Sequence, residues 1–136
     1  MKYLIDTNTC TYLINKKPPS AVSRIRSKQP EEVAVSTVTI AELEYGVHRS
    51  QKIDQDRIAL LEFLVPLTIL DFDQGAVAVY GSIRASLEQK GTPIGPMDLL
   101  LAAQALSHQL ILVTNNEREF RRVAGLQIEN WINERP

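Results

Sequence analysis

The sequence is poor in the residues that form covalent cross-links and soft-metal sites. It contains one cysteine, Cys10, and two histidines among 136 residues. A single cysteine excludes an internal disulfide and a cysteine-rich metal site. No apolar run approaches the roughly 18 residues of a membrane span, and the first residues, Met1 to Asp6, become charged too early for a signal peptide. Because nothing marks the chain for export or for a membrane, we expect a cytoplasmic protein.

The charges are almost balanced, so net charge alone favours no class of partner. There are 15 basic and 16 acidic residues, a net charge of −1, and 44% of the residues are apolar. This is an ordinary globular composition, and the length suits one domain with a hydrophobic core. The sequence contains no linker, internal repeat or low-complexity tract, so we expect a single domain spanning residues 1–136.

Short apolar runs alternate with helical patterns along the whole chain. The expected strands are residues 2–5, 32–36, 67–70 and 110–113, with a short fifth at 127–130. Continuous apolar strands that alternate with helices are typical of a parallel sheet covered on both faces. The sequence therefore predicts an α/β fold with a mostly parallel central sheet of four to five strands and helices on both faces.

Capping residues predict where several helices begin. Thr7, Asn8 and Thr9 are good N-caps for the first helix, and Asp73 for a long one after the third strand. Thr39 and Glu42 have the spacing of a capping box, which would place Glu42 in the first turn of the helix after the second strand.

Two helix interiors carry further expectations. Gly46 lies inside a predicted helix at a cost near 1 kcal/mol relative to alanine, which suggests close packing at that point. In the next helix, Ile58, Leu61 and Leu64 fall on one face, which we expect to be the inner one.

The stretch from Pro96 to Leu106 predicts a helix that is apolar on nearly every side, yet a carboxylate, Asp98, lies in its first turn. Proline suits the first helical position, and an acid there complements the helix dipole, a gain of roughly 0.3–1 kcal/mol. Capping alone would explain Asp98. However, three other acids lie in comparable places, each just beyond an apolar run: Asp6, Glu42 and Glu119.

These four acids are expected to meet at one rim of the sheet. Asp6 ends the first strand, Glu42 follows the second and Glu119 follows the fourth, while Asp98 opens the helix before the fourth. In an open parallel sheet, ligands bind outside the carboxyl ends of the strands. Each acid also has a structural interpretation: Asp6 as an acceptor for the next turn, Glu42 as a capping-box residue, and Glu119 as a solvated acid among arginines.

Convergence of four carboxylates would need a counter-charge. Two unit charges about 4 Å apart repel by roughly 4 kcal/mol at an effective dielectric near 20, against a total stability of about 5–15 kcal/mol. Some acids must therefore be protonated, or a cation must lie among them. Ligation by carboxylates alone favours Mg²⁺ or Mn²⁺ over zinc. Such an ion polarises a phosphate and lowers the pKa of an attacking water, so phosphodiester hydrolysis is the predicted reaction.

The rest of the chain is compatible with a polyanionic substrate. Setting the four acids aside changes the net charge from −1 to +3. Basic residues are available for phosphate contacts, or alternatively form solvated faces: Lys16, Lys17, Arg84, Lys90, Arg118, Arg121 and Arg122.

Four blocks of sequence resemble PIN-domain ribonucleases, and in particular the VapC toxins of bacterial type II toxin–antitoxin pairs. The blocks are Leu4–Asn8, Thr39–Gly46, Asp98–Ala105 and Leu112–Phe120, in this order over essentially the full length. The resemblance implies a PIN-like fold and a Mg²⁺-dependent endoribonuclease, with Mn²⁺ as a substitute. It implies catalytic and metal-binding roles for Asp6, Glu42, Asp98 and Glu119, of which the fourth position is the most variable, and site-ordering roles for Thr114 and Asn115.

The resemblance also implies partners. Members close to this pattern cleave tRNA, some at the anticodon stem-loop of initiator tRNA. They are inhibited by a cognate VapB antitoxin whose tail wraps the toxin. They typically form homodimers that assemble with antitoxin dimers into hetero-oligomers, without a membrane.

Two other functions remain open at this point. Leu4–Thr9 loosely matches the nucleophile motif of aspartate-nucleophile phosphatases, but Asn8 stands where a general acid is needed. No lysine follows Thr114, and that chemistry requires one to neutralise the phosphate. A non-catalytic module that only holds a partner is the other alternative, although such a module would gain stability by losing the four acids.

Overall fold

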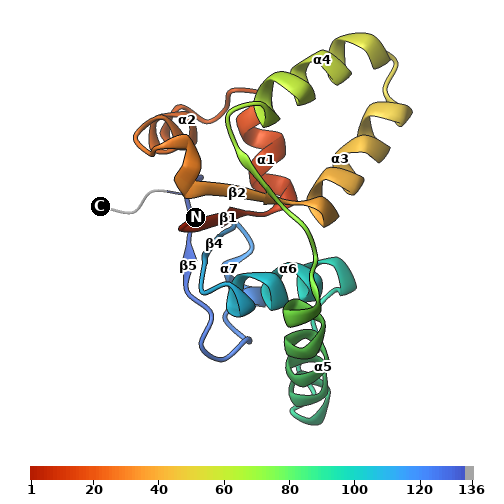
Figure 1. Cartoon of the computed structure of the whole chain (residues 1–136), viewed down its shortest axis with the longest axis vertical. Helices are drawn as coiled ribbons and strands as arrows, with labels where there is room; N and C mark the ends of the chain where they lie inside the picture. The colour runs from red at the N-terminus through yellow and green to blue at the C-terminus, as the bar shows by residue number, and fades with distance from the viewer. Residues whose placement is uncertain (134–136) are drawn as a thin grey trace.

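The computed structural model describes residues 1–133, and its centre is a five-stranded parallel sheet (Figure 1). The strand order is β3-β2-β1-β4-β5, with β1 in the middle. The strands are β1 (Tyr3–Ile5), β2 (Val33–Ser36), β3 (Thr68–Leu70), β4 (Ile111–Val113) and β5 (Ile128–Glu129). Leu4 of β1 lies opposite Ala34 of β2 on one side and Leu112 of β4 on the other. The predicted parallel sheet is confirmed.

Helices cover both faces of this sheet, as predicted (Figure 1). They are α1 (Thr7–Ile14), α2 (Pro19–Arg26), α3 (Thr37–Arg49), α4 (Ile53–Leu64), α5 (Gln74–Gln89), α6 (Pro96–Ser107) and α7 (Glu117–Phe120), with a 3₁₀ turn at Pro30–Glu32. Successive strand side chains point to opposite faces, so Tyr3 and Ile5 pack with α1 to α4 while Leu4 packs with α5 to α7. Within residues 1–133 no helix combines the length and apolarity needed to cross a bilayer.

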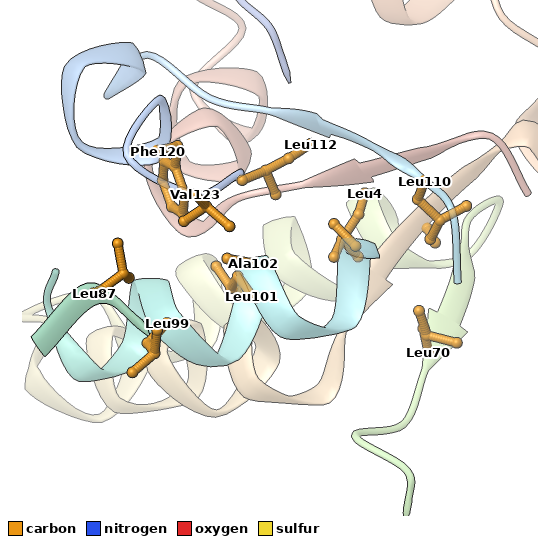
Figure 2. Close-up of a cluster of buried hydrophobic side chains, with 12 residues drawn as sticks. Leu4, Leu70, Leu87, Leu99, Leu101, Ala102, Leu110, Leu112, Phe120 and Val123 are labelled. Atoms are coloured by element: carbon orange, nitrogen blue, oxygen red, sulfur yellow. The ribbon is translucent and has the colours of Figure 1, made fainter. Parts of the chain in front are cut away.

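Helix α6 is the most deeply buried helix and sets the position of Asp98. Its Leu101 and Ala102 are almost fully buried and lie under Leu4 and Leu112 of the sheet (Figure 2). A tight turn, in which the Leu110 amide donates to the Ala105 carbonyl at 2.8 Å, leads from α6 into β4. The helix and the strand therefore run in opposite directions, and α6 begins near the rim where the strands end.

Two of the predicted capping assignments are wrong and one is confirmed. The N-cap of α3 is Ser36, whose hydroxyl accepts from the Val38 amide at 3.0 Å, so the capping box of Thr39 and Glu42 does not form and Glu42 lies in the second turn. The N-cap of α1 is Asp6 rather than a residue of Thr7–Thr9. Asp73 caps α5 as predicted.

The predicted inner face of α4 is only partly buried, because Leu64 packs against the core but Ile58 and Leu61 do not. Ile58 and Leu61 are 57% and 54% exposed, whereas Leu60 is 3% exposed and faces inward. Apolar residues lie on two sides of this helix, so periodicity did not distinguish the buried side. Gly46 of α3 is not closely packed either, because a Cβ at this position would meet no atom within 4 Å.

Candidate active site

Asp6 lies directly after the central strand and is 4% exposed. Its backbone amide donates to the Val113 carbonyl at 3.0 Å, and its Oδ1 accepts from the Thr9 amide at 2.9 Å. Burial raises the pKa of the Asp6 carboxyl, while hydrogen bonds with Thr114 and Thr9 oppose that rise. The structural interpretation of Asp6 as an acceptor for the next turn is therefore confirmed.

Glu42 is held by the residue that follows Asp6. The Thr7 hydroxyl donates to Glu42 Oε1 at 2.9 Å, and the Thr39 hydroxyl oxygen lies 3.2 Å from that of Thr7. These contacts join the first turn of α1 to the first two turns of α3, 35 positions apart in the chain. Thr7 thereby fixes the Glu42 carboxylate beside the segment that carries Asp6.

Asp98 experiences the charge of all three other acids. Its pKa is raised from 3.8 to about 6, first by burial and then by the negative charges of Glu119, Asp6 and Glu42. A side-chain hydrogen bond with Glu119 acts in the same direction. The four predicted acids therefore gather at the carboxyl rim of the sheet. Their catalytic role remains a prediction.

Glu119 connects α7 to the loop that precedes Asp98. Its Oε1 accepts from the backbone amide of Gly95, the N-cap residue of α6, at 2.7 Å, and its Oε2 accepts from Asn116 Nδ2 at 2.7 Å. Nearby, Arg122 Nη1 donates to the Pro93 carbonyl at 2.9 Å. Glu119 is thus held in the site by hydrogen bonds and is not simply a solvated surface acid.

The sequence did not single out Thr7, Asn116 or Gly95 as site residues. Their short spacing from the acids was the available signal, because Thr7 follows Asp6 and Asn116 lies three positions before Glu119. Thr114 hydrogen-bonds with Asp6 and accepts from the Asn116 amide at 2.9 Å. Asn115 Oδ1 instead accepts from Asn130 Nδ2 at 3.2 Å, a contact with the segment after β5.

Several basic residues considered for phosphate contacts are already engaged in the structure. Arg84 pairs with Glu88 at 3.0 Å and Arg121 with Glu117 at 2.9 Å. Exposed pairs of this kind contribute little to stability, typically up to about 1 kcal/mol, and are easily exchanged for another anion.

The donor set suits a hard divalent cation in its chemistry. All four carboxylates offer oxygen ligands, which Mg²⁺ and Mn²⁺ prefer. Among the described residues, however, no three His, Cys, Asp or Glu side chains are close enough together to hold a metal ion. Thr7 holds Glu42, and Gly95 and Asn116 hold Glu119. Metal binding would therefore require the acids to draw closer together than they lie here, while these hydrogen bonds orient the carboxylates of Glu42 and Glu119.

A parallel sheet in this order, with an acidic cluster at the carboxyl rim beside the central strand, is the architecture of a PIN-type α/β domain. A family model described as "PIN domain" matches residues 3–126. The chain therefore belongs to the PIN domain family. Ribonucleases of this family depend in general on divalent metal ions.

Curated relatives are similar over nearly the whole chain. Ribonuclease VapC2 of Rickettsia felis is 43% identical over 132 residues, which cover 96% of this chain and 98% of the relative. The tRNA(fMet)-specific endonuclease VapC of Shigella flexneri is 40% identical over 131 residues, with coverage of 96% and 98%. This similarity identifies the chain as a VapC-type member of the PIN domain family.

Solved structures have the same fold. VapBC2 from Rickettsia felis, bound to a DNA fragment from its promoter, matches with a TM-score of 0.90 and 42% identity, covering 96% of this chain and 99% of that one. DNA-bound VapBC from Salmonella typhimurium matches with a TM-score of 0.92 and 39% identity, covering 96% and 98%. The predicted PIN-like fold is confirmed.

Proposed function

We propose that this chain is the toxin of a VapBC-type toxin–antitoxin pair and acts as a metal-dependent endoribonuclease on tRNA. The observation that carries the proposal is the convergence of Asp6, Glu42 and Glu119 on Asp98, whose pKa is raised to about 6, first by burial and then by the negative charges of these acids. Four acids at one rim destabilise the fold, because their mutual repulsion must be offset. They are useful where a cation and a phosphodiester have to be brought together.

Asp6, Glu42, Asp98 and Glu119 would hold the cation, for which we propose Mg²⁺ with Mn²⁺ as a substitute. When bound, the ion supplies Lewis-acid polarisation of the phosphate and lowers the pKa of a coordinated water. The chain supplies orientation. Thr7 aims the Glu42 carboxylate, while Gly95 and Asn116 fix that of Glu119. The hydrogen bonds from Thr9 and Thr114 hold the Asp6 carboxyl in one orientation at the end of β1.

The substrate proposal comes from the relatives. The relative from Shigella flexneri and one from Salmonella typhimurium, 39% identical, are both named tRNA(fMet)-specific endonucleases. We propose initiator tRNA as the first substrate to test, with cleavage in its anticodon stem-loop. This activity would take place in the cytoplasm, where tRNA is found.

The partner proposal follows the same similarity. The solved relatives from Rickettsia felis and Salmonella typhimurium are VapBC complexes with DNA. We propose a VapB-type antitoxin as the cognate inhibitor, a homodimer of this chain, and a hetero-oligomer of the two proteins. We further propose that residues 1–136 form a single PIN domain.

Cleavage of defined tRNAs by the purified chain tests the function. Initiator tRNA should be cut in Mg²⁺ and left intact in chelator, while elongator methionine tRNA measures specificity. Asp98→Asn should abolish cutting, and Glu62→Gln, which removes an exposed acid from α4, should leave it unchanged. Equal cutting by the wild type and Asp98→Asn would indicate a contaminating nuclease. No cutting of any tRNA in Mg²⁺ or Mn²⁺ would leave the non-catalytic module as the better interpretation.

A further inference from the structure

An exposed aromatic residue and a cation lie on the same stripe of α3 as Glu42. Tyr45 is 63% exposed, and the Arg49 guanidinium lies 5.3 Å from the centroid of its ring. The spacings of three and seven residues from Glu42 place both on one helix face, about 4.5 Å and about 10 Å further along the axis. Of the two buried residues of α3, Val47 lies on another side, whereas Thr39 lies one turn before Glu42 at the buried start of the stripe. This stripe thus leads away from the acidic cluster into solvent.

Along this part of α3, and among the residues that the structure describes, the acidic residue Glu44 is ion-paired, whereas the basic residue Arg49 is not. Glu44 is bonded to Arg57 at 2.8 Å and lies 3.7 Å from His48, so its negative charge is already offset. Across residues 1–133 Arg49 makes no ion pair, and its guanidinium contacts the Tyr45 ring instead. Beyond Glu42 the stripe is therefore positive, with an arginine free to meet an anion.

We propose that Tyr45 and Arg49 form a subsite for one nucleotide of the RNA, adjacent to the phosphodiester that is cut. The base stacks on the Tyr45 ring and Arg49 contacts a phosphate. This inference rests on the proposed ribonuclease function and adds a substrate-binding subsite to it. An exposed ring offers a π-face to any base, and stacking on aromatic side chains is how proteins hold single-stranded nucleotides without reading their sequence. Arginine combines phosphate binding with stacking on an aromatic face.

The subsite explains why both features occur beside the acids. A phosphate drawn to the acidic cluster meets repulsion until a cation is bound, so positive charge close by is needed to hold the strand. Arg49 supplies that charge two helical turns from Glu42. Tyr45, lying between them, holds the neighbouring base and so fixes which phosphate faces Asp98 and Asp6.

RNA binding to Asp98→Asn protein, which leaves the substrate uncut, tests the subsite. In that background Tyr45→Ala should weaken binding of a cleavable stem-loop by about five- to a hundredfold, the range that loss of one stacked base implies. Tyr45→Phe should bind as tightly as Tyr45, because it keeps the ring. Arg49→Gln should weaken binding and reduce the slope of log affinity against log salt by about one. Arg26→Gln, an exposed arginine at the end of α2, is the matched control with the same change in charge.

A fluorescent variant gives a second measurement that does not depend on loss of affinity. Tyr45→Trp places an indole at the proposed stacking position, while the native Trp131 is fully buried. RNA should quench the new fluorescence, and an RNA with an abasic nucleotide at the stacked position should not. Absence of quenching by any bound RNA would overturn the subsite.

The outcomes separate the subsite from the function on which it rests. If the wild type neither binds nor cuts RNA, the proposed function fails. If the wild type cuts RNA and Tyr45→Ala binds and cuts it equally well, the function stands and the subsite alone is wrong. A change in sedimentation with unaltered RNA binding in Tyr45→Ala would assign this stripe to a protein contact and also overturn the subsite.

Discussion

The Glu119 carboxylate accepts a 2.7 Å hydrogen bond from the backbone amide of Gly95, the residue that precedes α6. A side chain after the fourth strand thereby holds the start of the helix that carries Asp98. After burial, the same carboxylate is also the next largest cause of the raised pKa of Asp98. Glu119 therefore has a positioning task in the fold as well as its proposed place among the ligands.

Glutamine and alanine at position 119 should separate these two tasks. Glu119→Ala removes the acceptor for Gly95 and should lower the free energy of unfolding by about 1 kcal/mol. Glu119→Gln keeps an oxygen for Gly95 and should unfold close to the wild type. If positioning dominates, the glutamine variant also retains most of its activity; if ligation dominates, both variants lose it. Denaturant unfolding and tRNA cleavage, measured on the same samples, distinguish these cases.

Thr7 should affect turnover more than substrate binding. Thr7→Val keeps the shape of the side chain but removes the hydroxyl that donates to Glu42. Without this hydrogen bond the Glu42 carboxylate loses its fixed orientation, which slows the chemical step. We therefore expect kcat to fall by about tenfold or more with little change in KM. Thr7→Ser restores the donor and should recover most of the loss. A rise in KM with unchanged kcat would contradict a positioning role.

Without divalent metal, Asp98 should make the fold less stable as the pH rises from about 4 to about 6. The pKa of its carboxyl rises from an ordinary value of 3.8 to about 6 in the folded chain, so in this window the folded state retains a proton that the unfolded chain has released. Stability then falls with rising pH. Glu44 and Asp73 act in the opposite direction because their pKa values are lowered. The informative quantity is therefore the difference between Asp98→Asn and the wild type.

That difference should grow across the window in favour of Asp98→Asn and level off above about pH 6. Urea unfolding at several pH values in chelator measures it. Glu62→Gln, which removes an exposed acid on α4, should show no such trend. A constant difference between pH 4 and 7 would mean that neither burial nor the other acids raise the pKa of Asp98 in the folded chain.

Divalent metal should raise the thermal midpoint at neutral pH. Binding to the folded state stabilises it by mass action, and the ion also relieves repulsion around Asp98. Mg²⁺ or Mn²⁺ at millimolar concentration should therefore shift the midpoint of the wild type upward and that of Asp98→Asn much less. Scanning calorimetry with and without chelator measures the shift. Equal shifts in the two proteins would point to a metal site elsewhere.

Gly46→Ala should stabilise the chain. Gly46 lies inside α3, and a Cβ there meets no atom within 4 Å. Alanine raises helix propensity and reduces the freedom of the unfolded chain, so we expect a gain of about 0.5–1 kcal/mol. Gly81→Ala in α5 has the same open surroundings and should behave alike, whereas Gly75→Ala would bring a Cβ within 3.0 Å of Ser107 Oγ and should gain less.

The sequence was sufficient for the fold and for the rim at which the acids meet. Uninterrupted apolar runs separated by helical patterns imply a parallel sheet, and a parallel sheet places the residues after its strands together. Asp6 and Asp98 could be predicted in this way because each follows or precedes a strongly apolar segment.

The finer errors arose where several residues could perform one task. Ser36, Thr37 and Thr39 are all capable caps, and in the structure the cap is Ser36, the last residue of β2. Likewise α4 is apolar on two sides, and the position of its neighbours decides that Leu60 is buried while Ile58 is exposed. Contacts such as that between Thr7 and Glu42 join segments far apart in the chain, which no local pattern contains.

Asp6 directly follows the central strand and also caps α1, and this has a practical consequence for producing the chain in living cells. Asp6→Ala would silence the proposed chemistry but also remove the cap of α1, at a cost of about 0.5–2 kcal/mol, and its yield would suffer. Within residues 1–133 Asp98 caps no helix, so Asp98→Asn should remove the proposed activity while keeping the fold and the native surface. In a selection for cells that survive expression of the chain, variants at Asp98 should accumulate as abundant protein. Variants at Asp6 should be present at low levels, because cellular proteases degrade them.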